Sequence, residues 1–154
     1  MTEGEKTTEK LTEILKRTRP SQAGRVLHEN EEKLAPAQGA FAEYVRAVMK
    51  KRRVTRQEVF LKAGVPERYG YKLISGQKTT QKRDVLIRIF LAAGFSLDET
   101  QRALKLAGLS ELYPRFKRDA VLMIAVNSGL GDPDDADELL KEQGFPPLAP
   151  CGED

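Results

Sequence analysis

The chain has 154 residues, of which 40% are apolar and 32% charged, and its formal net charge is +3. No apolar run approaches the roughly 20 residues that a membrane-spanning helix needs, the acidic first residues are unlike a secretory signal, and the single cysteine, Cys151, excludes an internal disulfide. We therefore expect a cytoplasmic protein without a membrane segment, built as one ordinary domain or as a small domain with extensions.

Positive and negative charges are segregated along the chain. Thirteen lysines and arginines lie between residues 46 and 88, where only three acidic residues oppose them. Beyond Asp119 the only basic residue is Lys141, among eight acidic residues. A basic centre followed by an acidic tail indicates a polyanion partner for the centre. The alternative is that these charges only solvate helix faces.

Residues 1–39 are expected to form a polar arm. The first seven residues are polar, which predicts disorder, and apolar spacing then predicts a short amphipathic helix over 8–17 and a weaker helical stretch over 26–34. Residues 35–39 are typical of a linker. Because the arm has too few apolar residues to fold alone, it either packs on the rest of the chain or binds another protein, and both interpretations remain open.

Residues 41–52 are predicted to form an amphipathic helix, because apolar residues recur at helical spacing from Phe41 to Met49. The basic residues Lys50 to Arg53 lie at its C-terminal end, where cations favour the helix dipole. The same cations are suited to phosphate contact, and the two interpretations are compatible.

Two short helices joined by a tight turn are predicted over residues 55–78. Thr55 and Glu58 have the spacing of a capping box, in which each side chain satisfies a free amide at the helix start. Gly64 ends the first helix, and Pro66 opens the second. A helix, a glycine-containing turn and a helix make the geometry of a helix-turn-helix, whose second helix can enter a DNA major groove.

This segment resembles the DNA-binding core of lambda-repressor-like regulators, the Xre family, and the resemblance covers about residues 40–100. The matching positions are Thr55, Glu58, Val59, Lys62, Ala63, Gly64, Val65, Leu73, Gly76 and Lys78. The chain departs from the family pattern at Arg56, Gly70, Ile74 and Thr80. The resemblance implies a lambda-repressor-like helical fold and a regulator that binds duplex DNA.

Two further helices complete this unit. Residues 83–93 are apolar nearly all round, which predicts the buried helix of the core. Ser96 and Glu99 make a second capping box, and helical spacing continues to Gly108. The five helices up to this point match the helix count of the lambda-repressor-like fold, so we assign residues 40–109 to a helix-turn-helix DNA-binding domain.

The rest of the chain repeats what precedes it. The sequence beginning Arg83-Asp84 recurs 35 residues later as Arg118-Asp119, and after one inserted residue the similarity continues to the end of each copy. Because a single helix pair cannot bury its apolar face, we expect the two copies to stack.

The predicted fold class is therefore all-α, a lambda-repressor-like helix-turn-helix bundle extended by a C-terminal helical pair that repeats the preceding one. In this scheme residues 110–150 are the extension, which repeats 83–114, and residues 151–154 are a tail. Asp132-Pro133 is expected to start the last helix.

The resemblance turns Gly70 and Leu73 of the second helix, residues 66–75, toward the core and leaves other side chains facing outward. Arg68 is suited to a guanine edge and Glu67 to cytosine, because their hydrogen-bonding groups complement those bases. The predicted DNA-binding residues are Arg56, Gln57, Glu67, Arg68, Tyr71, Lys72, Gln77, Lys78, Thr79 and Arg83.

Gly70 is the main feature against this interpretation. Glycine inside a helix costs on the order of 1 kcal/mol relative to alanine and removes an anchor between the two helices. Either the helices approach closely at Gly70, or the second helix is looser than in relatives. Tyr69 lies near the boundary of the outward face and is expected to pack.

Sequence motifs of common enzyme classes are absent. There is no His-Glu-x-x-His, no Gly-x-Ser-x-Gly and no phosphate-binding loop. The only histidine, His28, is expected on the surface of the arm, and acidic neighbours of Cys151 disfavour a thiolate. The acidic residues over 132–137 lack the glycine and terminal glutamate of a calcium loop. We therefore expect no catalysis, cofactor or metal.

Two functions from different classes remain. The first is a transcription regulator that binds double-stranded DNA as a homodimer and uses the repeated helices as a dimer or effector surface. The second is a non-enzymatic adaptor that keeps the fold without reading DNA, with a protein partner on residues 8–34 or 115–150. Gly70, Ile74, the acidic second copy and the unassigned N-terminal arm favour the adaptor. In a variant, the acidic tail closes on the chain's own basic face.

Overall fold

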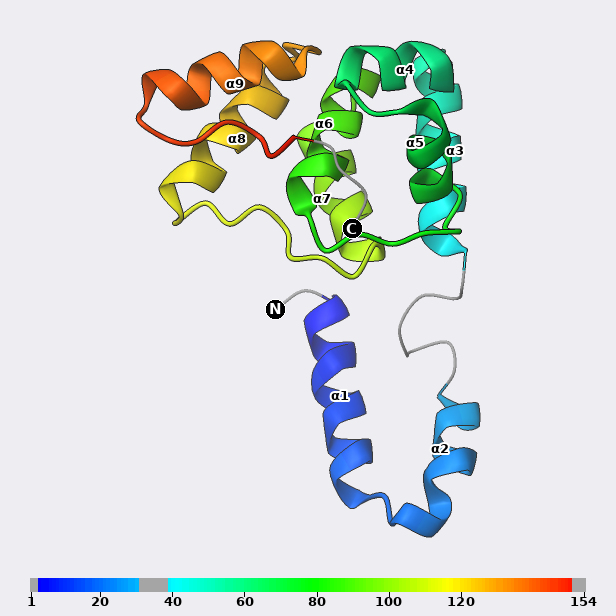
Figure 1. Cartoon of the computed structure of the whole chain (residues 1–154). Helices are drawn as coiled ribbons and strands as arrows, with labels where there is room; N and C mark the ends of the chain where they lie inside the picture. Colours follow the sequence, from blue (N-terminus) through cyan, green and yellow to red (C-terminus); the bar gives the residue numbers. More distant parts are fainter. Residues whose placement is uncertain (1–2, 31–38, 151–154) are drawn as a thin grey trace. The chain divides into compact units, whose positions relative to one another are not determined.

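The computed structural model describes residues 3–30 and 39–150. Secondary structure in these residues is entirely helical, without a strand (Figure 1). The chain divides into two compact units, residues 1–37 and residues 38–154, each of which is described by itself. Within the described ranges, no helix has the length and apolar character that crossing a membrane requires.

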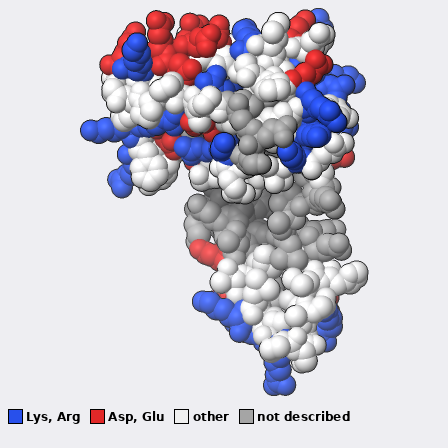
Figure 2. Space-filling view, viewed as in Figure 1, with Lys and Arg blue, Asp and Glu red and all other residues white. Residues whose placement is uncertain are grey.

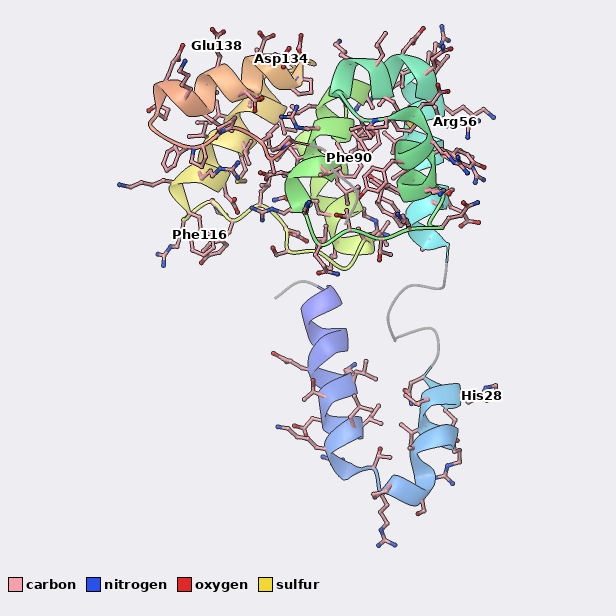
Figure 3. The ribbon with its side chains drawn as sticks, in the orientation of Figure 1. His28, Arg56, Phe90, Phe116, Asp134 and Glu138 are labelled. Atoms are coloured by element: carbon pink, nitrogen blue, oxygen red, sulfur yellow. The ribbon has the colours of Figure 1, made fainter. Side chains whose placement is uncertain are left out.

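The first unit contains α1 (Glu3–Arg17), η1 (Pro20–Gln22) and α2 (Ala23–Glu29). The predicted disorder of the first seven residues is wrong for residues 3–7, which belong to α1, because the glutamate and lysine there are good helix formers. The weaker helix predicted over 26–34 begins earlier, at Ala23, and residues 31–34 lie outside the described ranges. His28 is exposed on α2 (Figure 3).

The second unit is built around one apolar helix. Its elements are α3 (Ala40–Arg52), α4 (Arg56–Ala63), α5 (Glu67–Ile74), α6 (Arg83–Ala93), α7 (Leu97–Leu106), α8 (Lys117–Asn127) and α9 (Pro133–Glu142). Helix α6 packs against α4, α7 and α9, and its Ile87, Ile89 and Phe90 are fully buried. The predicted buried helix of the core is therefore confirmed.

The predicted helix ends are present in the structure. In both capping boxes the first side chain accepts a hydrogen bond from the backbone N–H three residues later, at 3.2 Å for Thr55 and 3.1 Å for Ser96. Gly64 has a φ of +70°, a conformation that glycine adopts without strain. Pro66 is the N-cap of α5 rather than its first helical residue, so α5 starts one residue later than predicted.

A close contact explains the glycine inside α5. A Cβ atom at Gly70 would lie only 2.6 Å from ring carbons of Phe60, a fully buried residue of α4. Glycine therefore lets α4 and α5 approach each other across an aromatic ring. Of the two explanations that the sequence left open for Gly70, the close approach is the correct one.

The two repeated stretches bind each other crosswise. Arg83 Nη2 donates to Asp119 Oδ1 at 2.5 Å, and Arg118 Nη2 donates to Asp84 Oδ2 at 2.9 Å. These arginines occupy equivalent positions in the two copies, and so do the aspartates. The exchange relates the copies as two halves of an approximate two-fold arrangement, like the reciprocal contacts of a symmetric dimer.

Backbone contacts follow the same exchange. Asp119 accepts from the backbone N–H of Tyr113 at 2.9 Å, and Asp84 accepts from the backbone N–H of Ala149 at 3.0 Å. Each carboxylate thus binds the chain segment that ends the other copy. The extension predicted over 110–150 consequently lies in the same compact unit as the helices before it.

We predict that Gly70→Ala lowers the free energy of unfolding by about 1–3 kcal/mol, the usual cost of overpacking a core. At an unhindered helical position the same change would stabilise by about 1 kcal/mol. Urea unfolding of Gly70→Ala, Phe60→Leu and the double variant tests the contact, since a smaller side chain at position 60 should remove the penalty of alanine. If Gly70→Ala changed the free energy of unfolding equally with phenylalanine and with leucine at position 60, the proposed contact would be contradicted.

The ion pair of Asp84 should make the fold sensitive to acid. Burial raises the pKa of Asp84, but hydrogen bonds from Arg118 and from the Ala149 amide outweigh burial and hold this pKa below its ordinary value. A carboxyl group with a lowered pKa stabilises the fold above its unfolded pKa of about 3.9, and that contribution is lost as the pH falls through the folded value.

We therefore expect Asp84→Asn to be less stable than the natural chain at neutral pH and to lose less stability on acidification. Urea unfolding from neutral pH to about pH 3, below the ordinary pKa of a carboxyl group, measures both effects. Asp135→Asn, at an exposed position on α9, is the matched control and should follow the natural chain. Parallel pH curves for Asp84→Asn and the natural chain would contradict the assigned role.

Candidate nucleic-acid interface

Part of the basic centre holds the fold together. Four of its cations form ion pairs with acidic residues of other helices: Lys51 and Arg52 with Glu99, Arg83 with Asp119, and Arg88 with Asp137. These cations bridge α3 to α7 and α6 to the second copy. For these four cations the structure shows a role in packing between helices, which the sequence analysis did not include.

Most of the other cations lie on α3, α4 and α5 or, like Arg53, directly after α3. Seven of them have no ion-pair partner within the described residues: Arg46, Lys50, Arg53, Arg56, Lys62, Arg68 and Lys72. Figure 2 shows basic side chains over α3–α5 and acidic side chains over α9. The segregation seen along the sequence therefore persists on the folded surface.

A surface groove runs between the N-terminal ends of α4 and α5, and we call it the α4–α5 groove. Its lining residues are Thr55, Arg56, Gln57, Phe60, Glu67, Arg68 and Tyr71. Five of the ten predicted DNA-binding residues are among them: Arg56, Gln57, Glu67, Arg68 and Tyr71. All five are exposed, so the fold brings together side chains from two helices that the sequence could only assign separately.

Arg56 and Tyr71 connect the two sides of this groove. The Arg56 guanidinium carbon lies 4.7 Å from the centroid of the Tyr71 ring, a cation–π geometry. Arg56 is the first residue of α4, where the Thr55 cap fixes the backbone, and Tyr71 lies in the middle of α5. The pair therefore holds a cation and an aromatic face in place at the surface.

A second groove adjoins the first on the side of α3. Arg56 and Tyr71 line both grooves, and Arg46 and Lys50 of α3 add two more cations to the second. Its floor includes the buried side chains of Met49 and Ile74. Arg46 was missed as a site residue, although its spacing of four residues from Lys50 places both on one helix face.

The remaining predicted residues lie elsewhere. Gln77 and Thr79 are exposed and Lys78 is half-buried in the loop after α5, while Lys72 is half-buried on α5. Arg83 is not part of this surface, because its guanidinium binds Asp119 and the backbone carbonyl of Glu111. Assigning Arg83 to DNA missed this role, since its partner lies 36 residues further along the chain.

Three residues of the helix-turn-helix segment and the loop after it are buried. Tyr69, predicted near the boundary of the outward face, is only 1% exposed. Ile74 is buried and packs in the core. Thr80 is also buried, and its hydroxyl oxygen accepts a hydrogen bond from the Lys82 backbone N–H at 3.0 Å. The departures from the family pattern at positions 74 and 80 therefore have a packing or capping role.

No known protein family, curated protein or solved structure matches this chain.

Proposed function

We propose that this protein is a non-enzymatic transcription regulator of the Xre type that binds double-stranded DNA in the cytoplasm. Helix α5 would enter the major groove, and the start of α4 would face the sugar-phosphate backbone. One observation carries the proposal: side chains suited to bases and to phosphates converge on the α4–α5 groove, among cations that have no ion-pair partner in the described part of the chain.

The exposed side chains at the start of α5 are suited to contact base edges. In helix-turn-helix proteins, the N-terminal residues of the second helix contact base edges. Glu67 and Arg68 are the first two residues of α5, and both are exposed. An arginine fork can bind the O6 and N7 of guanine, and a glutamate can accept from cytosine N4.

The surrounding cations suit the DNA backbone. Arg56 lies at the start of α4, and Arg46 and Lys50 line the adjoining groove on α3. Lysines and arginines that neutralise phosphates release counterions, so binding should weaken steeply with added salt. The Tyr71 ring, beside Arg56, offers a flat face to a sugar or to a thymine methyl group.

The packing of α3–α7 supports the proposed lambda-repressor-like bundle. Helices α4 and α5 are joined by the three residues between Ala63 and Glu67, and α4 also packs on α6. Val59 and Leu73, two positions that match the family pattern, are buried. These contacts would present α5 on the outside of a rigid support.

The adaptor hypothesis loses two of its supports. Gly70 accommodates Phe60, and Ile74 packs in the core, so neither residue argues against a firm, outward-facing α5. Nor do Asp134 and Glu138 of the acidic second copy cover the basic surface, because they lie on α9, away from Arg56 (Figure 3). We therefore favour DNA binding over a protein adaptor.

Selection from random duplex DNA tests the proposal most broadly. We expect an enriched sequence, bound by the natural chain and not by Arg68→Glu, because the substitution places a carboxylate where a cation meets the base edges and phosphates. Lys105→Glu, which changes an exposed lysine on α7 by the same charge, is the control and should bind nearly as well. No enrichment, together with a co-purifying stoichiometric protein, would favour the adaptor instead.

Arg56→Lys separates the stacking of the arginine from its charge. Lysine keeps the charge but loses the planar contact with Tyr71, and an exposed cation–π contact contributes about 0.5–1 kcal/mol. Fluorescence anisotropy with the selected duplex should show about a two- to five-fold loss of affinity, the equivalent of that energy, with an unchanged salt dependence. Unchanged affinity would show that the contact between Arg56 and Tyr71 does not contribute to DNA binding.

A further inference from the structure

Helix α8 has an apolar face that no described part of its unit covers. Phe116, immediately before the helix, and Ile124 are each 63% exposed. With Ala120 between them they recur every four residues, so they form one stripe along the helix surface. Tyr113 extends the stripe, since its ring meets that of Phe116 edge-on at 5.0 Å between centroids.

The internal repeat allows the exposed residues of α8 to be compared with the equivalent residues of α6. Ala120 and Ile124 of α8 correspond to Val85 and Ile89 of α6, which are fully buried. Helix α4 packs along α6, whereas the described helices with which α8 packs extensively are α7 and α9. The helical part of the stripe, Ala120 and Ile124, is therefore the counterpart of two positions that are buried in the first copy.

We propose that this face binds the same face of a second copy of the chain, with the two α8 helices antiparallel about a two-fold axis at Ala120. The stripe has a large, a small and a large side chain at equal spacing. In the antiparallel arrangement Phe116 meets Ile124 of the other copy, and the two alanines allow close approach at the crossing point. A two-fold interface requires this kind of self-complementarity.

Charge favours the same arrangement. Arg115 and Lys117 lie at the N-terminal end of α8, and both are exposed. Beyond its C-terminal end the chain continues into Asp132 and Asp134 at the start of α9. Antiparallel helices bring the basic end of one copy toward the acidic end of the other, whereas parallel helices would bring like charges together. A second copy thus provides apolar side chains opposite the stripe and acidic side chains opposite the basic end of α8.

The proposed dimer does not rest on DNA binding, because the stripe is separate from the α4–α5 groove and contributes no residue to it. The stripe consists of four side chains, whereas a standard interface has roughly 20–30 residues on each side. We therefore expect a reversible dimer whose population depends on protein concentration.

Disulfide trapping tests the two-fold axis directly. In the full chain with Cys151→Ser, we expect Ala120→Cys to form an intermolecular disulfide under mild oxidation, because the two β-carbons would lie near the roughly 3.8 Å that a disulfide needs. Ala47→Cys, at an exposed alanine of α3, is the matched control and should crosslink slowly. Equal crosslinking of the two variants would overturn the proposed axis.

Sedimentation equilibrium without DNA tests the dimer itself. The natural chain should associate reversibly, and Ile124→Lys should weaken the association at least about tenfold, because the change occurs twice in a symmetric interface. Ala47→Lys should associate like the natural chain, and circular dichroism checks that every variant is folded. A chain that stays monomeric at its highest soluble concentration would overturn the proposal. The proposal would also be overturned if a different protein bound the monomer and Ile124→Lys abolished that binding.

Discussion

The contact between Phe60 and Gly70 determines how the candidate DNA-binding surface is built. Phe60 is fully buried, yet its ring also lies at the base of the α4–α5 groove, so one side chain links the core to the surface. A side chain at position 70 would push α5 away from α4 and displace Glu67 and Arg68 at its start. Because interiors are densely packed, there is little room to absorb such a shift. Gly70, which lowers the intrinsic stability of α5, is therefore also the residue that allows α5 to pack at this distance from α4.

The charged residues of the basic centre have two separable roles. Some pair with carboxylates of other helices, above all Arg83 with Asp119 in the crosswise exchange between the repeated stretches. Others, such as Arg56 and Arg68, point outward without an ion-pair partner among the described residues. Partly buried pairs become costly when one partner is removed. The exchange therefore ties the second copy to α6, the helix on which α4 packs. The acidic side chains of the second copy lie mainly on α9.

Local features of this protein could be predicted from the sequence because local interactions determine them. The capping boxes, the glycine that ends α4 and the apolar character of α6 depend on residues within a few positions of one another. The reason for Gly70 could not be predicted, because it depends on which side of α4 Phe60 occupies. Likewise, Arg83 looked like another cation of the basic centre until the fold placed it beside Asp119. Half of the predicted site residues converge on one groove. Sequence alone could not distinguish the exposed arginines of this groove, Arg56 and Arg68, from an arginine such as Arg83 that forms an ion pair between helices.

Backbone amide chemical shifts, recorded by NMR while duplex DNA of the selected sequence is added, test the central claim most directly. The account predicts the largest changes at residues 55–57 and 67–72, where the starts of α4 and α5 form the groove, with smaller changes along α3. Amides of α8 and α9 should change little, since the exposed stripe of α8 and the acidic side chains of α9 lie outside the proposed contact. Changes concentrated on α8 or α9, or none at all at a salt concentration where the DNA is bound, would contradict the account.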